Sequence, residues 1–365
     1  MARETLRIGL IGANVTKGWS PRAHIPAILG LPELELAAVC TAHEDTAKES
    51  AQKFGAKLAF HDHREMLDKA DIDIVGVSVR VPEHYRLTMD ALEAGKHVYT
   101  EWPLGADLEE AEQMAALADA KGVHTMVGLQ ARCSPVFLRL RELIEEGYVG
   151  RVLSCRMTQF GSGVLARASD RTWQRDVTLG ANTLTIAFGH VVDSLCMCLG
   201  EFREVSAVTG TQVPQWMDTD TGRMVDVTSP DNVLVSGVLD NGAMVSAHVA
   251  SVPYHGSRYR LEVYGREGTL VVEADEHPQL DGMRLLGAKG SDPTLSELPV
   301  PERLTWVPHG VPKGPPFNVA QMWSRFADAI QIGKEAEPDF SLAVTRHRLL
   351  AAIQRASDTG VRQTM

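Results

Sequence analysis

The sequence is poor in the features that mark secreted, membrane-spanning or nucleic-acid-binding proteins. Only five of the 365 residues are cysteine, at positions 40, 133, 155, 196 and 198, and this odd, scattered set fits a reducing cytoplasm better than a disulfide framework. The start does not resemble a signal peptide, and no apolar run is close to the roughly 20 residues that cross a bilayer, so we expect a cytoplasmic protein without a membrane partner. The net charge of -11 and the lack of a basic stripe argue against nucleic acid as a partner.

Metal ligands at zinc-site spacing are also missing. Cys196 and Cys198 lie in an apolar, helix-like segment without a second pair of ligands, so we predict core packing for them and no metal site. What remains is ordinary globular composition, 44% hydrophobic and 23% charged, in a chain long enough for two domains.

Strands and helices alternate over about the first 125 residues. Buried strands are indicated by short apolar runs, at Leu6–Gly12, Leu34–Cys40, Leu58–Phe60, Ile72–Val79, Val98–Thr100 and Thr125–Leu129. Helical patterns lie between most of them, and glycines such as Gly55 and Gly122 end two of these helices. This alternation is typical of an α/β fold, and we predict a Rossmann-type, doubly wound parallel sheet.

The pattern changes after residue 150. Strand-like runs now dominate, at Glu204–Thr211, Asn232–Leu239, Ala243–Ser251, Arg258–Tyr264 and Thr269–Glu273, and helices are expected at Thr183–Leu199, Asn318–Gly333 and Phe340–Thr359. Short loops join the later strands as hairpins, and Gly287–Pro316 is expected to be irregular surface. We therefore predict a dinucleotide-binding domain over residues 1–125, and an α+β domain with a mostly antiparallel open sheet, for substrate binding and oligomerisation, over residues 126–365.

A glycine-bearing loop follows the first strand. Gly12 ends that strand, and Ser20-Pro21 is typical of a helix N-cap followed by the first helical residue. Backbone N–H groups at such a helix start suit a pyrophosphate. The motif is imperfect, because Asn14 and Lys17 stand where a G-x-G-x-x-G motif from Gly12 needs glycine. The residues that we expect at a dinucleotide here are Gly12, Ala13, Asn14, Gly18, Trp19 and Ser20.

The end of the second strand bears on the choice between NAD and NADP. A site that prefers NAD usually has an acid there for the ribose 2′-OH, and Thr41 occupies the position instead. Without that acid a 2′-phosphate meets no repulsion, although no arginine stands there to bind it. We expect NADP to bind at least as well as NAD.

Three motifs resemble those of one known family. They are Gly95-Lys96-His97-Val98 followed by Glu101-x-Pro103, the segment from Val127 to Pro135, and Gly189-His190-Val191-Val192-Asp193. On these residues the chain resembles, over nearly its whole length, the glucose-fructose oxidoreductase, inositol dehydrogenase and rhizopine-catabolism (Gfo/Idh/MocA) family. The resemblance implies a nicotinamide cofactor and a sheet-rich second domain.

The chain departs from this family at two positions that matter for catalysis. The family's active dehydrogenases use the Lys of a Glu-Lys-Pro motif and an Asp four residues before the histidine of the catalytic helix. Trp102 and Ile186 stand at these positions here, and only His190 matches. Several segments resemble instead a subgroup that includes the galactose-regulon repressor of yeasts, namely Lys17-Gly18-Trp19, Glu101-Trp102, Leu129–Pro135 and Phe188-Gly189-His190. That resemblance implies a protein that can bind a nicotinamide dinucleotide and act through protein contacts.

Two functions therefore fit the sequence. The first is an NAD(P)-dependent oxidoreductase acting on a sugar-like, carbonyl or imine small molecule, with His190 as general acid/base, Trp102 shaping the substrate pocket, and Tyr85 and Tyr254 as fallback proton donors. The second is a catalytically inactive sensor in which the cofactor shifts a conformational equilibrium. In either case the further residues that we expect at the cofactor are Thr41, Ser78, Arg80, His84, Glu101, Trp102 and Gln130.

The strand pattern also predicts self-association. Asn232–Leu239 carries apolar residues beyond one alternating face, and the predicted helices are too few to cover both faces of its sheet. We expect a homo-oligomer, a dimer or tetramer, formed through the sheet of the second domain.

Overall fold

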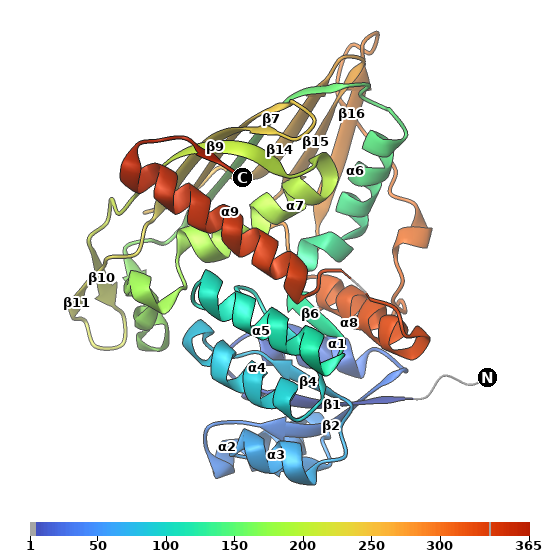
Figure 1. Ribbon diagram of the computed structural model, residues 1–365, viewed down its shortest axis with the longest axis vertical. Coiled ribbons are helices and arrows are strands. Elements are labelled where there is room, and N and C mark those ends of the chain that lie inside the picture. Colours follow the sequence, from blue (N-terminus) through green and yellow to red (C-terminus); the bar gives the residue numbers. More distant parts are fainter. Residues whose placement is uncertain (1–4, 336) are drawn as a thin grey trace. The chain divides into compact units, whose positions relative to one another are not determined.

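The computed structural model describes residues 5–335 and 337–365 and divides the chain into two compact units (Figure 1). The first unit contains Met1–Cys133 together with Trp306–Thr345, and the second contains Ser134–Thr305 together with Arg346–Met365. This division differs from the expected boundary at residue 125 in two ways. The last strand of the first sheet ends after that residue, and a distant segment returns to complete the first unit.

The first unit is built on a six-stranded parallel sheet in the order β3-β2-β1-β4-β5-β6. Its strands are β1 (Leu6–Ile11), β2 (Leu34–Cys40), β3 (Leu58–Phe60), β4 (Ile74–Val77), β5 (His97–Glu101) and β6 (Thr125–Gly128). The central β4 is buried along its whole length, because both of its faces are covered. The strand order reverses between β1 and β4, and a sheet of this kind binds ligands at the carboxyl ends beside that point. The Rossmann-type prediction is confirmed.

Helices connect these strands. They are η1 (Ser20–His24), α1 (Ile25–Leu29), α2 (Glu44–Phe54), α3 (His63–Lys69), η2 (Val81–Glu83), α4 (His84–Glu93), α5 (Leu108–Lys121) and η3 (Gln130–Cys133). Asp62 and Asp107 cap α3 and α5 by accepting hydrogen bonds from backbone N–H groups. Gly55 and Gly122 end α2 and α5 in the left-handed conformation, as the sequence predicts.

A segment from late in the chain completes the core of the first unit. Helix α8 (Pro315–Ile332) buries Trp323 and Phe326 in the same apolar cluster as residues of β1 and α1. Val307 and Val311, which precede the helix, belong to this cluster too. The prediction that the whole of Gly287–Pro316 is irregular surface is therefore wrong for these two valines. It is also wrong for the strand residues Gly287–Lys289 and Ser296–Glu297 and for the short helix Glu302–Leu304, in which Leu304 is buried.

The second unit contains a nine-stranded sheet in the order β17-β16-β15-β14-β7-β13-β12-β9-β18. Its strands are β7 (Val152–Ser162), β9 (Phe202–Gly210), β12 (Asn232–Leu239), β13 (Met244–Val252), β14 (Arg258–Gly265), β15 (Gly268–Ala274), β16 (Met283–Lys289), β17 (Ser296–Glu297) and β18 (Gln363–Thr364). Only β7 and β13 are parallel among the recorded pairs of this sheet. A mostly antiparallel sheet is thus confirmed. The expected hairpins β12–β13 and β14–β15 are present.

Helices α6 (Pro135–Glu145), η6 (Thr183–Phe188), α7 (Gly189–Leu199) and most of α9 (Phe340–Thr359) belong to the second unit. A small sheet of β8 (Ala166–Arg167), β10 (Gln215–Asp218) and β11 (Met224–Asp226) stands beside the short helices η4 (Ser169–Arg175) and η5 (Val177–Leu179). By length and composition alone, Val177–Leu199 is apolar enough to cross a membrane, but 67% of it is buried inside the protein, as in the core helix of a folded domain.

Candidate functional site

The loops after β1 and β4 approach each other closely at the point where the strand order reverses. Gly12, at the end of β1, has a φ of +89°, and a Cβ atom added to it would lie 2.1 Å from the backbone carbonyl oxygen of Ser78. Only glycine fits such an approach. The loops after β1 and β4 therefore pack directly against each other, at the place where the fold binds a dinucleotide.

The glycine-bearing loop is held by Asn14 rather than by a second glycine. The Asn14 Oδ1 atom accepts hydrogen bonds from the backbone N–H groups of Thr16 and Lys17, both at 3.0 Å. Gly18 then takes a φ of +91°, in the left-handed region that favours glycine. This local turn explains how the departure from G-x-G-x-x-G at residue 14 is accommodated.

The helix after this loop starts differently from the prediction. Trp19, and not Ser20, is the N-cap residue, and η1 begins at Ser20 with a π-helical first turn. Ser20 therefore does not cap the helix, so the predicted N-cap role is wrong. Its hydroxyl is fully buried and has no hydrogen-bond partner among the described residues.

A second buried hydroxyl lies beside the same loop. Ser78 follows β4, is 7% exposed, and its Oγ atom also has no partner among residues 5–335 and 337–365. Buried polar groups are nearly always hydrogen-bonded, so an unpartnered hydroxyl in the first turn of η1 and another just after β4 are available to a polar ligand. A pyrophosphate at the start of η1 would supply acceptors to them, and the residues present fit this group.

Thr41 lies after β2, where the sequence places the reader of the cofactor ribose. Its hydroxyl donates to the backbone carbonyl oxygen of His43 at 2.9 Å and lies 2.6 Å from the Thr46 hydroxyl. The side chain is thus uncharged and already engaged within its own turn. Arg80, two residues beyond Ser78, is exposed.

Glu101, the last residue of β5, is buried in a polar network. The His24 Nε2 atom lies 2.7 Å from its Oε1, and Gln130 Nε2 lies 3.1 and 2.9 Å from its two carboxyl oxygens. On the other side of the imidazole, the indole N–H of Trp323 donates to His24 Nδ1 at 3.0 Å. Gly128 makes room for the carboxylate, because an added Cβ would lie 2.3 Å from Glu101 Oε2.

His84 holds the two loops that follow β4 and β5. Its Nδ1 lies 2.8 Å from the carbonyl oxygen of Pro103, and its Nε2 lies 3.2 Å from that of Val79. Burial lowers the pKa of His84, and the hydrogen bonds to the two carbonyl oxygens act in the opposite direction. Its nitrogens face backbone oxygens, so its geometry favours positioning of the loops over contact with a cofactor. The neighbouring Trp102 is 5% exposed.

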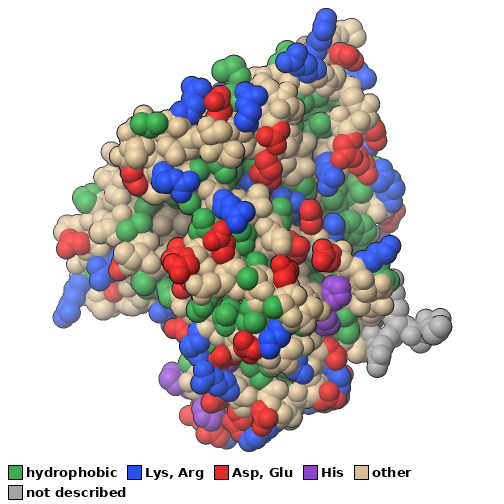
Figure 2. All heavy atoms as spheres, viewed as in Figure 1, with side chains coloured by type: hydrophobic (Ala, Val, Ile, Leu, Met, Phe, Trp, Pro, Cys, Tyr) green, Lys and Arg blue, Asp and Glu red, His purple; other side chains and the backbone are tan. Residues whose placement is uncertain are grey.

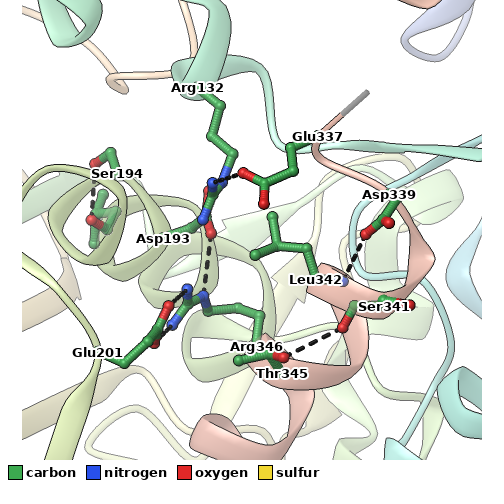
Figure 3. Close-up of polar contacts among 11 residues, drawn as sticks. Arg132, Asp193, Ser194, Glu201, Glu337, Asp339, Ser341, Leu342, Thr345 and Arg346 are labelled. Atoms are coloured by element: carbon green, nitrogen blue, oxygen red, sulfur yellow. Dashed lines mark hydrogen bonds and ion pairs between the residues drawn. The ribbon is translucent and has the colours of Figure 1, made fainter. Parts of the chain in front are cut away.

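In the second unit, His190 lies in the first turn of α7 and is buried. An ionic cluster within the same unit fixes this helix (Figure 3). Arg346 of α9 is fully buried and donates to Asp193 at 3.1 Å, and it forms a bidentate pair with Glu201 at 3.0 and 2.8 Å. The strong Arg–carboxylate geometry ties α7 to α9 and so restricts the orientation of His190.

Two residues of the Glu101 network were missed in the sequence. His24 fits an apolar helical pattern, which conceals a buried histidine with a polar role, and Trp323 is 299 residues away in the chain. The only local signal that could have identified His24 is its place in the helix that follows a cofactor-type loop. Of the predicted residues, the first unit brings Gln130 and Glu101 into contact, and Gly12 next to Ser78.

The comparisons with known families agree with this architecture. Residues 6–129 match the oxidoreductase family with an NAD-binding Rossmann fold, and residues 135–274 match the C-terminal domain of Gal80p. The dehydrogenase aclE of Aspergillus oryzae is 32% identical over 252 residues, which are 66% of this chain and 68% of that protein. The galactose/lactose metabolism regulatory protein GAL80 of Saccharomyces cerevisiae is 28% identical over 295 residues, 74% of this chain and 67% of the regulator.

Solved structures share the fold over the whole chain. A super-repressor mutant of Gal80p from Saccharomyces cerevisiae has a TM-score of 0.88 at 23% identity, covering 99% of this chain and 97% of its own. A levoglucosan dehydrogenase in complex with NADH and L-sorbose has a TM-score of 0.86 at 24% identity and covers 99% of both chains. The chain therefore belongs to the Gfo/Idh/MocA oxidoreductase family, with an NAD-binding Rossmann domain followed by a domain of the Gal80p C-terminal type.

Proposed function

We propose that the protein is an NAD(P)-dependent oxidoreductase that acts on a sugar-like, carbonyl or imine small molecule. The observation that carries this proposal is the pair of buried, unpartnered hydroxyls of Ser78, whose backbone lies against Gly12 at the reversal of strand order, and of Ser20 at the start of η1. They are donors without acceptors, as expected of a site made for a dinucleotide. Similarity to a levoglucosan dehydrogenase supports a sugar-like substrate, since that relative is 27% identical over 299 residues.

A bound nicotinamide dinucleotide would supply the hydride chemistry. The residues of this chain would bind and orient it and manage the proton. The backbone from Gly12 to Ser20 would bind the pyrophosphate, and Gln130 would keep the Glu101 carboxylate in place. His190 is the proposed general acid/base, because an imidazole exchanges protons near neutral pH. Trp102, which is flat and apolar, would favour a substrate with a ring face.

The first experiment titrates the protein with NAD⁺, NADH, NADP⁺ and NADPH while Trp emission is recorded, followed by a turnover screen of sugars, polyols, ketones and imines. We expect binding of at least one pair and turnover of at least one substrate class. His190→Ala should lower turnover by about 10²–10⁴-fold with nearly unchanged cofactor affinity, whereas exposed His61→Ala should change neither. Binding without turnover of any compound would overturn the oxidoreductase proposal.

The cofactor pair is expected to be NADP(H) at least as readily as NAD(H), because Thr41 carries no charge that repels a 2′-phosphate. Thr41→Asp should shift the preference toward NAD(H). A wild-type protein that strongly prefers NAD(H), together with an unchanged Thr41→Asp variant, would remove Thr41 from this role.

A regulatory function is the second candidate. The buried Trp102 favours it, because an indole cannot replace the lysine that the family's active dehydrogenases carry at that position. The relation to GAL80, a regulatory protein by name, also supports it. In that case the cofactor would shift a conformational equilibrium, and binding of all cofactors without turnover would be the expected result.

We also propose that a second copy of this chain covers the outer face of the nine-stranded sheet. This face has a hollow of about 490 Å³ lined by residues of four strands, among them Thr158, Phe160, Val208, Leu234, Ser246 and His248. Val208 and Met244 on it are 64% and 65% exposed. Arg260 lies 3.0 Å from both Glu262 and Glu273 there, so the face carries both charge signs and can pair with itself about a two-fold axis.

Light scattering tests this proposal. We expect a mass of two or four chains at micromolar concentration. Leu234→Glu, on the outer face and 44% exposed, should dissociate the assembly, whereas Leu58→Glu, 41% exposed on the first unit, should not. A wild-type monomer would overturn the proposal.

We further propose a reducing cytoplasmic location and no nucleic-acid partner. All five cysteines are free and buried, which supports a protein that needs no disulfides. Basic and acidic side chains are interspersed on the face drawn in Figure 2, so this face does not carry the basic stripe of an electrostatic nucleic-acid site.

A further inference from the structure

The Glu101 network fixes the protonation of its members through geometry. An indole N–H can only donate, so His24 Nδ1, 3.0 Å from Trp323 Nε1, must be an acceptor. The ring proton is thereby assigned to Nε2, which faces Glu101 Oε1 at 2.7 Å. His24 is a neutral donor in this arrangement, because a doubly protonated ring could not accept from Trp323.

Glu101 is ionised in the same arrangement. Its two oxygens receive His24 Nε2–H and the amide N–H groups of Gln130, all of them donors. A protonated carboxyl group would direct its own O–H at one of these donors, so only the carboxylate satisfies every contact.

The carboxylate therefore keeps an uncompensated negative charge. Its recorded partners in the described part of the chain are a neutral imidazole and a neutral amide, and the residue is 9% exposed. Burying a charge in this way is costly unless something positive approaches it. Trp323 and His24 act as positioning residues that maintain this state, and Gly128 leaves the space for it.

The position of the Glu101 carboxylate in the sheet indicates which part of a bound dinucleotide lies beside it. Glu101 ends β5, in the half of the sheet formed by β4, β5 and β6. In folds of this strand order the first half binds the adenosine side of a dinucleotide and the second half binds the other nucleotide. For a nicotinamide cofactor, the second half receives the ring that is cationic when oxidised and neutral when reduced.

We propose that the buried Glu101 carboxylate, positioned by His24 and Trp323, makes this site bind the oxidised nicotinamide dinucleotide more tightly than the reduced one. The inference rests on the proposed dinucleotide function. It assigns to Glu101 an electrostatic role that raises the population of the oxidised form, and so lowers the reduction potential of the bound couple.

The experiment measures the dissociation constants of the oxidised and reduced forms of whichever cofactor pair binds better, by calorimetry, for the wild-type protein and its variants. Glu101→Gln removes the charge and keeps the shape. Gly128→Ala keeps the charge but pushes the carboxylate aside, since the atoms in the way are the end of the Glu101 side chain. Both should raise the ratio of the oxidised to the reduced dissociation constant roughly tenfold, the effect of one charge at several ångströms in a medium of intermediate polarity.

Matched controls separate charge from simple loss of structure. Asp73→Asn makes the same kind of change beside the amino end of β4, where the carboxylate is paired with Arg7, and it should leave the ratio unchanged. His24→Leu should raise the ratio of the oxidised to the reduced dissociation constant. His24→Gln keeps an N–H donor at the same position, so its ratio should lie close to the wild-type value. A general loss of folding would lower both affinities together and leave the ratio constant.

The outcomes distinguish this inference from the function on which it rests. If the wild-type protein binds both forms and the ratio is unchanged in Glu101→Gln and Gly128→Ala, the electrostatic role of Glu101 is refuted while dinucleotide binding stands. If the wild-type protein binds neither form of either cofactor at millimolar concentration, roughly the weak limit of a meaningful site, both proposals fail.

Discussion

Two buried charged side chains, one from each unit of this protein, are held in opposite ways. In the second unit, the Arg346 guanidinium is surrounded by the carboxylates of Asp193 and Glu201 (Figure 3). In the first unit, the Glu101 carboxylate receives hydrogen bonds from a neutral histidine and a neutral amide. Both groups are satisfied as hydrogen-bonding partners, but only Arg346 is compensated as a charge.

The difference separates a structural charge from an available one. Opposite charges in contact weaken each other's field, so the Arg346 guanidinium, paired with two carboxylates, fixes helices and offers no free positive charge to a ligand. Neutral hydrogen-bond donors orient the Glu101 carboxylate without cancelling its charge. The carboxylate can therefore still attract a bound cation. A buried ion should therefore be judged by whether its partners carry charge, and not only by whether it has partners.

The largest predicted effect comes from breaking the compensated cluster. Arg346→Met leaves Asp193 buried without this counter-charge and should destabilise the protein by about 3–5 kcal/mol. The double variant Arg346→Met/Asp193→Asn should be less destabilised than the sum of the single changes. Urea unfolding of the four proteins measures both effects. Strict additivity would show that the two residues do not act as a pair.

The Glu101 network should show a smaller loss. Glu101→Gln sets a new amide N–H against the donors of His24 and Gln130, so one of them loses its acceptor at a cost of about 1–3 kcal/mol, from which the relief of removing a buried charge is subtracted. Glu101→Gln/Gln130→Glu restores a carboxylate–amide pair with the charge moved by one side chain, and most of the stability should return. The unfolding midpoints of the wild-type protein, the single variants and the double variant give the coupling energy between residues 101 and 130. No recovery in the double variant would mean that the geometry, and not the pairing, sets the stability.

His97 sharpens the comparison, because it is a half-buried base that is held in its neutral form. Burial, reinforced by the nearby His124, lowers its pKa to about 4. The folded state then binds the proton more weakly than the unfolded chain, so His97 contributes stability above pH 6.5 that is lost as the pH falls toward 4.

Between pH 7 and pH 5 this contribution should fall by about 2 kcal/mol. His97→Asn keeps an acceptor for the backbone N–H of His124, which lies 3.0 Å from His97 Nδ1, and should reduce the loss. Urea unfolding at the two pH values measures it. Equal losses in both proteins would exclude His97 as the source.

The smallest effect is expected for exposed pairs. Lys48 and Glu44 form an i,i+4 ion pair on α2, and both side chains are mostly exposed. Water screens such charges, so Lys48→Ala should leave the unfolding midpoint unchanged within experimental scatter. A clear shift would weaken the view that burial, and not contact alone, gives an ion pair its importance.

The sequence predicted the elements where local pattern decides them. The bounds of Leu34–Cys40, Asn232–Leu239 and Phe340–Thr359 agree with the structure, because periodicity and end signals are strong there. The two-residue β8 was missed because so short a strand has no period. The parallel pairing of β7 and β13 was missed because nothing local specifies a partner about 90 residues away in the chain.

The candidate site divides in the same way. Gly12, Ser78 and Glu101 follow from the rule that ligands meet the carboxyl ends of parallel strands. His24 and Trp323 do not, because their contact depends on tertiary packing. Ser20 shows a local rule failing. Its position before Pro21 is typical of an N-cap, but the helix starts one residue earlier, and the Ser20 hydroxyl has no hydrogen-bond partner in the part of the chain that the structure describes.

The return of α8 into the first unit has a consequence for protein synthesis. A ribosome makes all of β1 to β6 before it makes Trp323, which is fully buried in the core of that unit. The nascent nucleotide-binding region must wait, with part of its apolar surface uncovered, until nearly the whole chain has emerged. The two units therefore cannot be separated by one cut, and a gene truncated after codon 133 would encode an incomplete core.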